Sequence, residues 1–316
     1  MRDRLISELV DHLFRHQAGR LTSALTRVFG AENLDLAEDV TQEALIKTLR
    51  NWTIRWVPDD PAAWLYRVAR NAALDALRRR TTVRTHEPEI VDLFEARLDD
   101  ACEHYFSGEI VDDQLRMMFT SCHTSILPDA RIALTLKTVG GFSVEEIAGA
   151  FLARPTTIAQ RLVRAKSTIR KLEIPFAVPG PNELTERLGS VLGVFYLMFN
   201  EGYHAQRGEN LVREDLCIEA TRLAELVADH TVTGVPQSHA LVALMRLQGS
   251  RLASRIDGNG DLLLADQDRT TWNVEWIERG LRYLEAAADG DHLTSYHLEA
   301  GIAACHATAT SFDETN

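Results

Sequence analysis

Two helical patterns separated by a proline, between residues 143 and 171, constrain the fold of this chain more than any other stretch. Ser143 and Glu146 form the signature of a capping box, which predicts that a helix begins at Val144. Pro155 blocks continuation of that helix and is favoured in the first turn of the next one. Apolar residues then recur at helical spacing, so the two patterns predict a helix-turn-helix with one buried stripe. The stripe consists of Ile158, Leu162, Ala165 and Ile169.

The other faces of the second helix carry amide, hydroxyl and basic side chains. Between Arg154 and Lys171 there are six basic residues and no acidic one. Amide and guanidinium groups read base edges in the major groove, and further cations bind phosphates. We therefore expect this helix to bind duplex DNA; a helical hairpin with a solvated basic face is the alternative. The candidate DNA contacts are Thr157, Gln160, Arg161, Arg164 and Lys166.

The net charge of −12 does not argue against nucleic-acid binding, because it is unevenly distributed. Residues 180–316 contain 10 Lys and Arg against 21 Asp and Glu, whereas residues 1–179 contain 24 against 25. Local basic patches attract DNA whatever the charge of the whole chain. The sequence contains no signal peptide and no apolar run of about 18 residues, so we expect a cytoplasmic protein with no membrane contact.

No residue spacing in the chain is typical of a catalytic or metal site. The four cysteines are far apart and form no CxxC pair, so we expect no zinc module, no other metal and no cofactor. No nucleophile, phosphate-loop or metal motif is present, and we expect that the protein is not an enzyme.

The first 80 residues read as entirely helical, and the pattern from Leu36 to Trp52 is the most informative part. Acidic and amide side chains lie on the face opposite its apolar side, around one exposed aliphatic residue. Such a patch suits a basic partner surface, and a solvated helix face is the alternative. The patch consists of Asp39, Gln42, Glu43 and Ile46.

A loop and a second helical pattern follow, and both suit contact with single-stranded nucleic acid. Trp56 lies in a loop between Thr53 and Pro61, and the helix is expected from Ala62 to Arg80. An aromatic ring offers a stacking platform, an amide can bind a base edge, and cations bind phosphates. These side chains fall in one stripe, and basic residues near a helix C-terminus also complement its dipole. The stripe consists of Trp64, Arg67, Asn71, Leu74 and Arg78. The candidate contacts are Trp56, Trp64, Arg67, Asn71, Arg78 and Arg79.

Taken together, these segments resemble bacterial RNA polymerase sigma factors of the extracytoplasmic-function (ECF) class. The resemblance rests on DLAEDVTQEALIKTLRNW, PAAWLYRVARNAALDALRRR and the helix-turn-helix, which are similar to regions 2.2, 2.3–2.4 and 4.2 in order and spacing across residues 8–172. It implies promoter DNA and core RNA polymerase as partners, through the β′ clamp and the β flap. It further implies that the patch at residues 39–46 docks on the β′ clamp helices. The Trp56 loop and the Trp64–Arg80 helix would then melt and read the −10 element, and the helix from Pro155 would read the −35 element. Ala159 departs from the family pattern, in which Arg or Lys is frequent.

The resemblance and the composition together imply an all-α fold with four parts. They are a region 2 domain (1–84), an acidic linker (85–110), a region 4 helix-turn-helix domain (111–173) and a C-terminal helical-hairpin domain (182–316). The last part resembles the tetratricopeptide-like extension of one ECF group, with helices expected near 184–200, 214–229, 237–256, 271–287 and 292–308. Its DGNGDL segment lacks the glycine and the glutamate of a calcium loop and is expected to be a turn.

Two questions of function stay open at this point. A conventional helix-turn-helix transcriptional regulator with a C-terminal effector domain is the alternative to a sigma factor, and it has no use for the patch at residues 39–46. The acidic C-terminal domain could regulate in cis by masking the basic helices, could stabilise the active arrangement, or could bind an anti-sigma or other regulatory protein.

Overall fold

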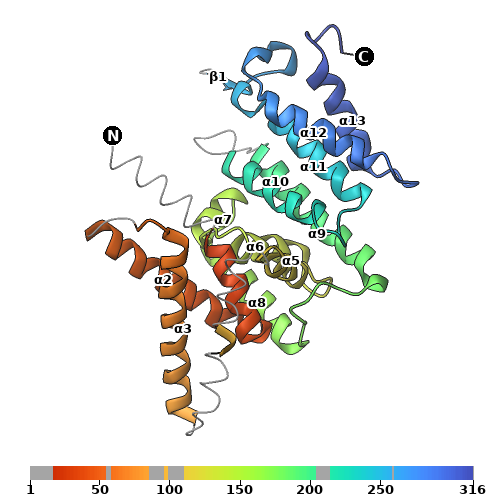
Figure 1. Ribbon diagram of the computed structural model, residues 1–316. Helices are drawn as coiled ribbons and strands as arrows, with labels where there is room; N and C mark the ends of the chain where they lie inside the picture. The colour runs from red at the N-terminus through yellow and green to blue at the C-terminus, as the bar shows by residue number, and fades with distance from the viewer. Residues whose placement is uncertain are drawn as a thin grey trace. The chain divides into compact units, whose positions relative to one another are not determined.

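The computed structural model describes residues 17–54, 58–84, 96–98, 110–203, 214–257 and 260–315. The chain divides into two compact units. The N-terminal unit comprises Met1–Ala148 and Arg154–Arg187, and the C-terminal unit comprises Gly149–Ala153 and Leu188–Asn316. The described part is helical apart from one two-residue β-ladder, which confirms the all-α prediction (Figure 1).

The N-terminal unit begins with a helical segment at 17–29, followed by the short 3₁₀ helix η1 (Ala31–Asn33), α2 (Leu34–Ile54) and α3 (Pro61–Arg84). Gly30 separates the first two elements with a φ of 85°, a conformation that favours glycine. α2 therefore begins at Leu34, two residues before the start of the predicted pattern at Leu36. The segment 17–29, α2 and α3 enclose two apolar clusters that include Leu21, Leu25, Val40, Ala69 and Ala72.

One residue of the predicted linker belongs to this core. Leu98 is fully buried, and its carbonyl accepts a hydrogen bond from the hydroxyl of Tyr66 at 3.0 Å. The residues on both sides of the short helical stretch 96–98 lie outside the described part of the chain.

Between residues 110 and 171 the structure describes the helices α5 (Ile110–Ser121), α6 (Pro128–Thr138), α7 (Val144–Ala150) and α8 (Pro155–Lys171). Pro128 is the first residue of α6, a position that favours proline because its missing N–H has no helical partner there. α8 packs against α6 through the predicted stripe, all of which is buried. Burial of each Leu or Ile side chain contributes about 1.5–3 kcal/mol to the free energy of unfolding.

The helices of the C-terminal part are α9 (Pro181–Tyr203), α10 (Glu214–Ala228), α11 (Pro236–Gly249), α12 (Val274–Ala287) and α13 (Ser295–Thr308). α11 lies at the centre of the C-terminal unit, since α10, α12 and α13 all pack against it. Gly280 lets α12 approach α11 closely: a Cβ atom there would lie 2.8 Å from Cγ of Leu247. Arg246 of α11 forms an ion pair with Glu225 of α10 at 2.6 Å, and Arg279 of α12 joins the same carboxylate at 3.2 Å.

Several predicted helix boundaries in this unit differ from the observed ones by three or more residues, and two of these differences coincide with specific contacts. The helix predicted to reach Ile256 ends at Gly249, where the ring of Trp276 packs so closely that a Cβ atom would lie 2.3 Å from it. The chain continues through η2 (Leu252–Ser254), β1 (Ile256–Asp257), β2 (Gly260–Asp261), η3 (Leu264–Asp266) and η4 (Arg269–Thr271). The next helix begins at Val274 rather than near 271, because the side chain of Asn273 caps it by accepting from the amide of Trp276 at 3.1 Å.

No described helix is both long and apolar enough to cross a membrane. Within the same residues, no cluster of three or more His, Cys, Asp or Glu side chains is arranged to hold a metal ion.

The cysteines provide a simple test of this packing. Cys122 and Cys217 are 1% and 0% exposed, and burial raises the pKa of both thiols, that of Cys122 to about 11. Cys305 is exposed. In a Cys102→Ser variant we therefore expect one thiol to react with an aromatic disulfide reagent in the native protein and three after unfolding, because the thiolate is the reactive form. Rapid reaction of a second thiol in the native protein would contradict the burial of these two residues.

Candidate nucleic-acid interface

The start of α7 is fixed by the predicted capping box. The amide of Ser143 donates to the carboxylate of Glu146 at 2.8 Å, and the amide of Glu146 donates to the Ser143 hydroxyl at 3.1 Å. α8 then begins at Pro155, after Arg154 in an extended conformation, as the residue before a proline prefers. These local interactions place α8 as the second helix of a helix-turn-helix.

The candidate duplex-binding side chains of α8 differ in exposure. Gln160 and Arg164, one helical turn apart, are exposed, whereas Thr157 is half-buried. Arg161 is also half-buried and forms an ion pair with Asp129 of α6 at 3.0 Å. The surface open to a duplex therefore centres on Gln160 and Arg164.

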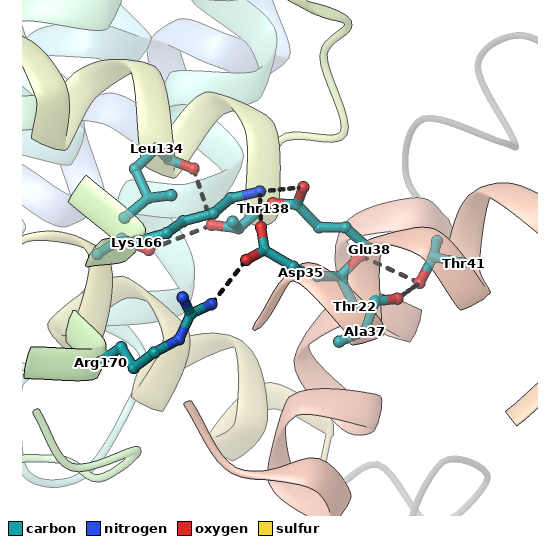
Figure 2. Close-up of polar contacts among 10 residues, drawn as sticks. Thr22, Asp35, Ala37, Glu38, Thr41, Leu134, Thr138, Lys166 and Arg170 are labelled. Atoms are coloured by element: carbon teal, nitrogen blue, oxygen red, sulfur yellow. Dashed lines mark hydrogen bonds and ion pairs between the residues drawn. The ribbon is translucent and has the colours of Figure 1, made fainter. Parts of the chain in front are cut away.

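Lys166 is directed away from that surface, toward α2. Its ammonium group lies 2.9 Å from a carboxylate oxygen of Asp35 and 2.7 Å from one of Glu38, and only 14% of its side chain is exposed (Figure 2). Arg170, one turn further along α8, donates to the other oxygen of Asp35 at 2.8 Å and to the carbonyl of Glu32 at 3.2 Å. We call these four charged residues, Asp35, Glu38, Lys166 and Arg170, the acid–base junction.

Burial and pairing oppose each other within the acid–base junction. Burial raises the pKa of Glu38, and the neighbouring Lys166 opposes that rise. Burial also acts to lower the pKa of Lys166, but the two carboxylates outweigh it and the pKa is raised. Lys166 therefore stays charged at neutral pH. The pKa of Asp35 is lowered, because hydrogen bonds from Lys166 and Arg170 outweigh its partial burial.

α2 presents the candidate partner-binding patch as one exposed stripe. Asp39 and Gln42 are exposed, and Ile46 is 49% exposed. Leu49 is also 42% exposed, and it continues the stripe at helical spacing. The stripe therefore contains two neighbouring aliphatic side chains rather than one.

Glu43 differs from the rest of the patch because it is half-buried and already paired. Its carboxylate lies 2.7 Å from the ammonium of Lys47 and 3.7 Å from the guanidinium of Arg79 on α3. The hydrogen bond from Lys47 lowers the pKa of Glu43. A candidate for partner docking and a candidate for DNA contact therefore contact each other.

Most of the candidates on α3 share one exposed side. Arg67, Asn71, Arg78 and Arg79 are exposed, and Trp64 is half-buried against Trp52 with 5.9 Å between ring centroids. Leu74 does not belong to this stripe, because it is 4% exposed and packs in the apolar cluster with Leu25 and Val40. Trp56 lies outside the described residues.

The C-terminal unit contains a separate shallow groove of mixed charge. Its lining includes Asp229, Glu275 and the exposed Arg282, and Tyr283 in the same lining donates to Asp229 at 2.7 Å. The combination of both signs of charge suits a polar protein surface better than a nucleic-acid backbone.

Sequence reasoning missed the carboxylates of the acid–base junction. Glu38 was placed in neither the apolar face nor the exposed patch of α2, and Asp35 precedes the predicted start of that helix at Leu36. Spacing along the chain contains no signal for this contact, since the partners are 128 and 131 residues apart. The excess of basic residues on α8 was the one sequence feature that pointed to carboxylates of the same chain as possible partners.

Comparison with known families gives three matches along the chain. The family described as "Sigma-70 region 2" matches residues 13–83, and "Sigma-70, region 4" matches residues 116–169. A "Family of unknown function (DUF6596)" matches residues 187–288. No solved structure matches the chain significantly.

Proteins of similar sequence include named RNA polymerase sigma factors. An uncharacterized protein of Rhizobium meliloti (strain 1021) is 38% identical over 295 residues, covering 93% of this chain and 69% of that protein. The "ECF RNA polymerase sigma factor SigE" of Mycolicibacterium smegmatis is 30% identical over 161 residues, covering 51% of this chain and 60% of that protein. The "RNA polymerase sigma-H factor" of Pseudomonas aeruginosa is 33% identical over 142 residues, covering 43% of this chain and 72% of that protein. The chain therefore belongs to the extracytoplasmic-function class of RNA polymerase sigma factors, the initiation factors that direct the polymerase to promoters.

Proposed function

We propose that this sigma factor divides its work among three helices of the N-terminal unit. The stripe on α2 docks on the β′ clamp of core polymerase, α3 with the preceding loop binds and opens the −10 element, and α8 reads the −35 element as duplex. The observation that supports this most directly is the side-by-side exposure of Gln160 and Arg164 on a helix whose opposite face is buried. The match to region 2 favours this function over a conventional regulator, which needs no polymerase-docking helix.

The proposed mechanism requires binding energy and no covalent chemistry by the chain. Opening the −10 element costs a few kcal/mol for each unstacked base, which contacts from α3 must offset. Arg67 and Asn71 are exposed and can reach a flipped base and its phosphate, while Trp64 offers the edge of a ring already held by Trp52. We therefore propose a non-enzymatic initiation factor that acts in the cytoplasm, where its polymerase partner is located.

We further propose four parts with separate roles: region 2 at 1–84, a linker at 85–110, region 4 at 111–173 and a regulatory part at 182–316. The helical hairpins of the last part and its mixed-charge groove suit a protein partner, such as an anti-sigma protein, or control in cis. Its excess of 11 negative charges (10 basic against 21 acidic residues) makes direct binding to DNA unfavourable.

Run-off transcription tests the proposed function. The full chain is mixed with bacterial core polymerase and genomic DNA, and the 5′ ends of the RNA are mapped. We expect discrete new start sites preceded by a shared pair of −35 and −10 elements. Random start sites, or none with either the full chain or a chain ending near Leu172, would contradict the proposal. Activity of the shorter chain alone would make the C-terminal part an inhibitor.

A further inference from the structure

We propose that Asp35 and Glu38 form an internal docking site for the basic end of α8, from which duplex DNA must displace Lys166 and Arg170. This inference rests on the proposed role of α8 in duplex binding and adds a closed state that limits it. In that state region 4 is held against region 2 within the N-terminal unit, and two cations that would bind phosphates are occupied by carboxylates.

The charges and distances support this competition. An ammonium group has three donors, and in Lys166 two of them already point at Asp35 and Glu38, at 2.9 and 2.7 Å. The Glu38 side chain is only 11% exposed, so the pair is partly shielded from solvent and less screened by salt than a surface pair. Figure 2 shows both carboxylates on the Lys166 ammonium group. A phosphate that binds through these two donors must therefore replace both carboxylates.

Packing between the two regions supports the closed state independently of the acid–base junction. Gly19 of the helical segment 17–29 faces Val139 at the end of α6, and a Cβ atom on Gly19 would lie 1.8 Å from the Val139 carbonyl oxygen. No side chain fits in that space. Nearby, Arg27 of the same segment forms an ion pair with the buried carboxylate of Asp113 on α5 at 3.3 Å. Region 2 and region 4 therefore meet over a surface that extends well beyond the acid–base junction.

The closed state leaves part of α8 accessible. Gln160 and Arg164 stay exposed, whereas Lys166 and Arg170 point at α2. A duplex can therefore meet the base-reading side chains first and gain the two phosphate contacts only after the junction opens. Because the apparent affinity falls with the fraction of molecules in the open state, the junction weakens DNA binding by free sigma factor.

Two pairs of variants of the full chain test this, one through charge and one through shape. Asp35→Asn with Glu38→Gln weakens the junction, and Asp59→Asn with Asp75→Asn makes the same charge change at exposed residues of region 2. Gly19→Ala forces the packed backbones apart without any change of charge. Gly189→Ala is its control, because a Cβ atom at Gly189 meets nothing within 4 Å.

Two measurements are made on each variant. Spin labels at Arg50→Cys and Lys171→Cys, both exposed sites, report the separation of α2 and α8 in a Cys102→Ser, Cys305→Ser background. Fluorescence anisotropy reports binding to a random-sequence duplex of about 25 base pairs over a range of salt concentrations. In the Asp35→Asn, Glu38→Gln variant and in the Gly19→Ala variant, we expect the distribution of distances between the two spin labels to broaden. We also expect the affinity for the duplex to rise roughly 3- to 10-fold in both. The salt dependence of log K should steepen by about one to two units.

The charge-swapped variant Glu38→Lys with Lys166→Glu tests whether the other variants change because the contact is lost or because they misfold. It should restore a narrow distance distribution while binding DNA more weakly than the wild type, since the cation no longer belongs to α8. The proposal would be overturned if the spin-label distances stayed narrowly distributed in both the Asp35→Asn, Glu38→Gln variant and the Gly19→Ala variant. It would also be overturned if the distances broadened while the affinity for DNA stayed at the wild-type value. If no variant binds duplex at all, the proposed role of α8 fails instead, which is a different result from binding that the junction does not affect.

Discussion

Ile46→Asp is expected to abolish binding of the full chain to core polymerase, raising the dissociation constant at least about 100-fold. Ile46 is 49% exposed and lies in the α2 stripe between Gln42 and Leu49. An aliphatic side chain exposed in the free protein and buried on docking is a typical interface anchor. Aspartate at this position would bury an unpaired charge, which costs several kcal/mol, and about 1.4 kcal/mol corresponds to a tenfold change. A titration of labelled sigma factor with core polymerase measures the effect.

Leu263→Asp is the matched control, because it places the same charge on a leucine that is 75% exposed in the C-terminal unit. Its affinity for core polymerase should equal that of the wild type. Glu43→Gln should have a smaller effect than Ile46→Asp, since Glu43 is already paired with Lys47 and Arg79. Equal binding of core polymerase by Ile46→Asp and Leu263→Asp would refute docking through this stripe.

Local patterns predicted the helix-turn-helix well because its determinants are close together in the chain. A capping box spans three residues, Pro155 acts on its own turn, and the stripe from Ile158 to Ile169 lies within one helix. Each of these features stabilises its structure whatever the rest of the protein does. By contrast, the end of α11 at Gly249, where Trp276 of another helix packs closely, was not predicted.

Features that depend on which elements pack together could not be derived from spacing alone. Leu74 was assigned to the exposed stripe of its helix, but it is buried in one apolar cluster with Leu25 of the segment 17–29. The contact between Lys166 and Glu38 joins residues 128 positions apart. Periodicity identifies a buried or an exposed face, but it does not identify the partner of a charged side chain.

The roles of the candidate residues came from resemblance, and exposure adds a limit to them. Gln42, Arg67 and Gln160 all lie where a partner can reach them, as their proposed roles require. In the closed state a partner cannot reach Lys166 in this way, because its side chain is only 14% exposed. A residue type suited to phosphate binding is equally suited to a carboxylate of its own chain, and only the tertiary structure separates the two uses.

Replacing both Gln160 and Arg164 with Ala is expected to lower the affinity for the −35 element about 100-fold, while binding to a scrambled duplex falls far less. Each bidentate contact to a base contributes about 1–3 kcal/mol of discrimination, whereas a phosphate contact contributes the same for every sequence. Both side chains are exposed on α8, so the substitutions leave its buried stripe intact. Competition between the two duplexes, using the element mapped by run-off transcription, gives the specificity ratio.

Lys171→Ala is the control for this experiment, since Lys171 is an exposed cation at the end of the same helix. It should weaken binding to both duplexes equally and reduce the salt dependence of log K by about one unit. The specificity ratio of Arg161→Ala should fall between those of the double variant and Lys171→Ala, because the ion pair of Arg161 with Asp129 must break before Arg161 contacts DNA. An unchanged specificity ratio in the Gln160 and Arg164 variant would assign base reading to another surface of region 4 and restrict α8 to phosphate contact.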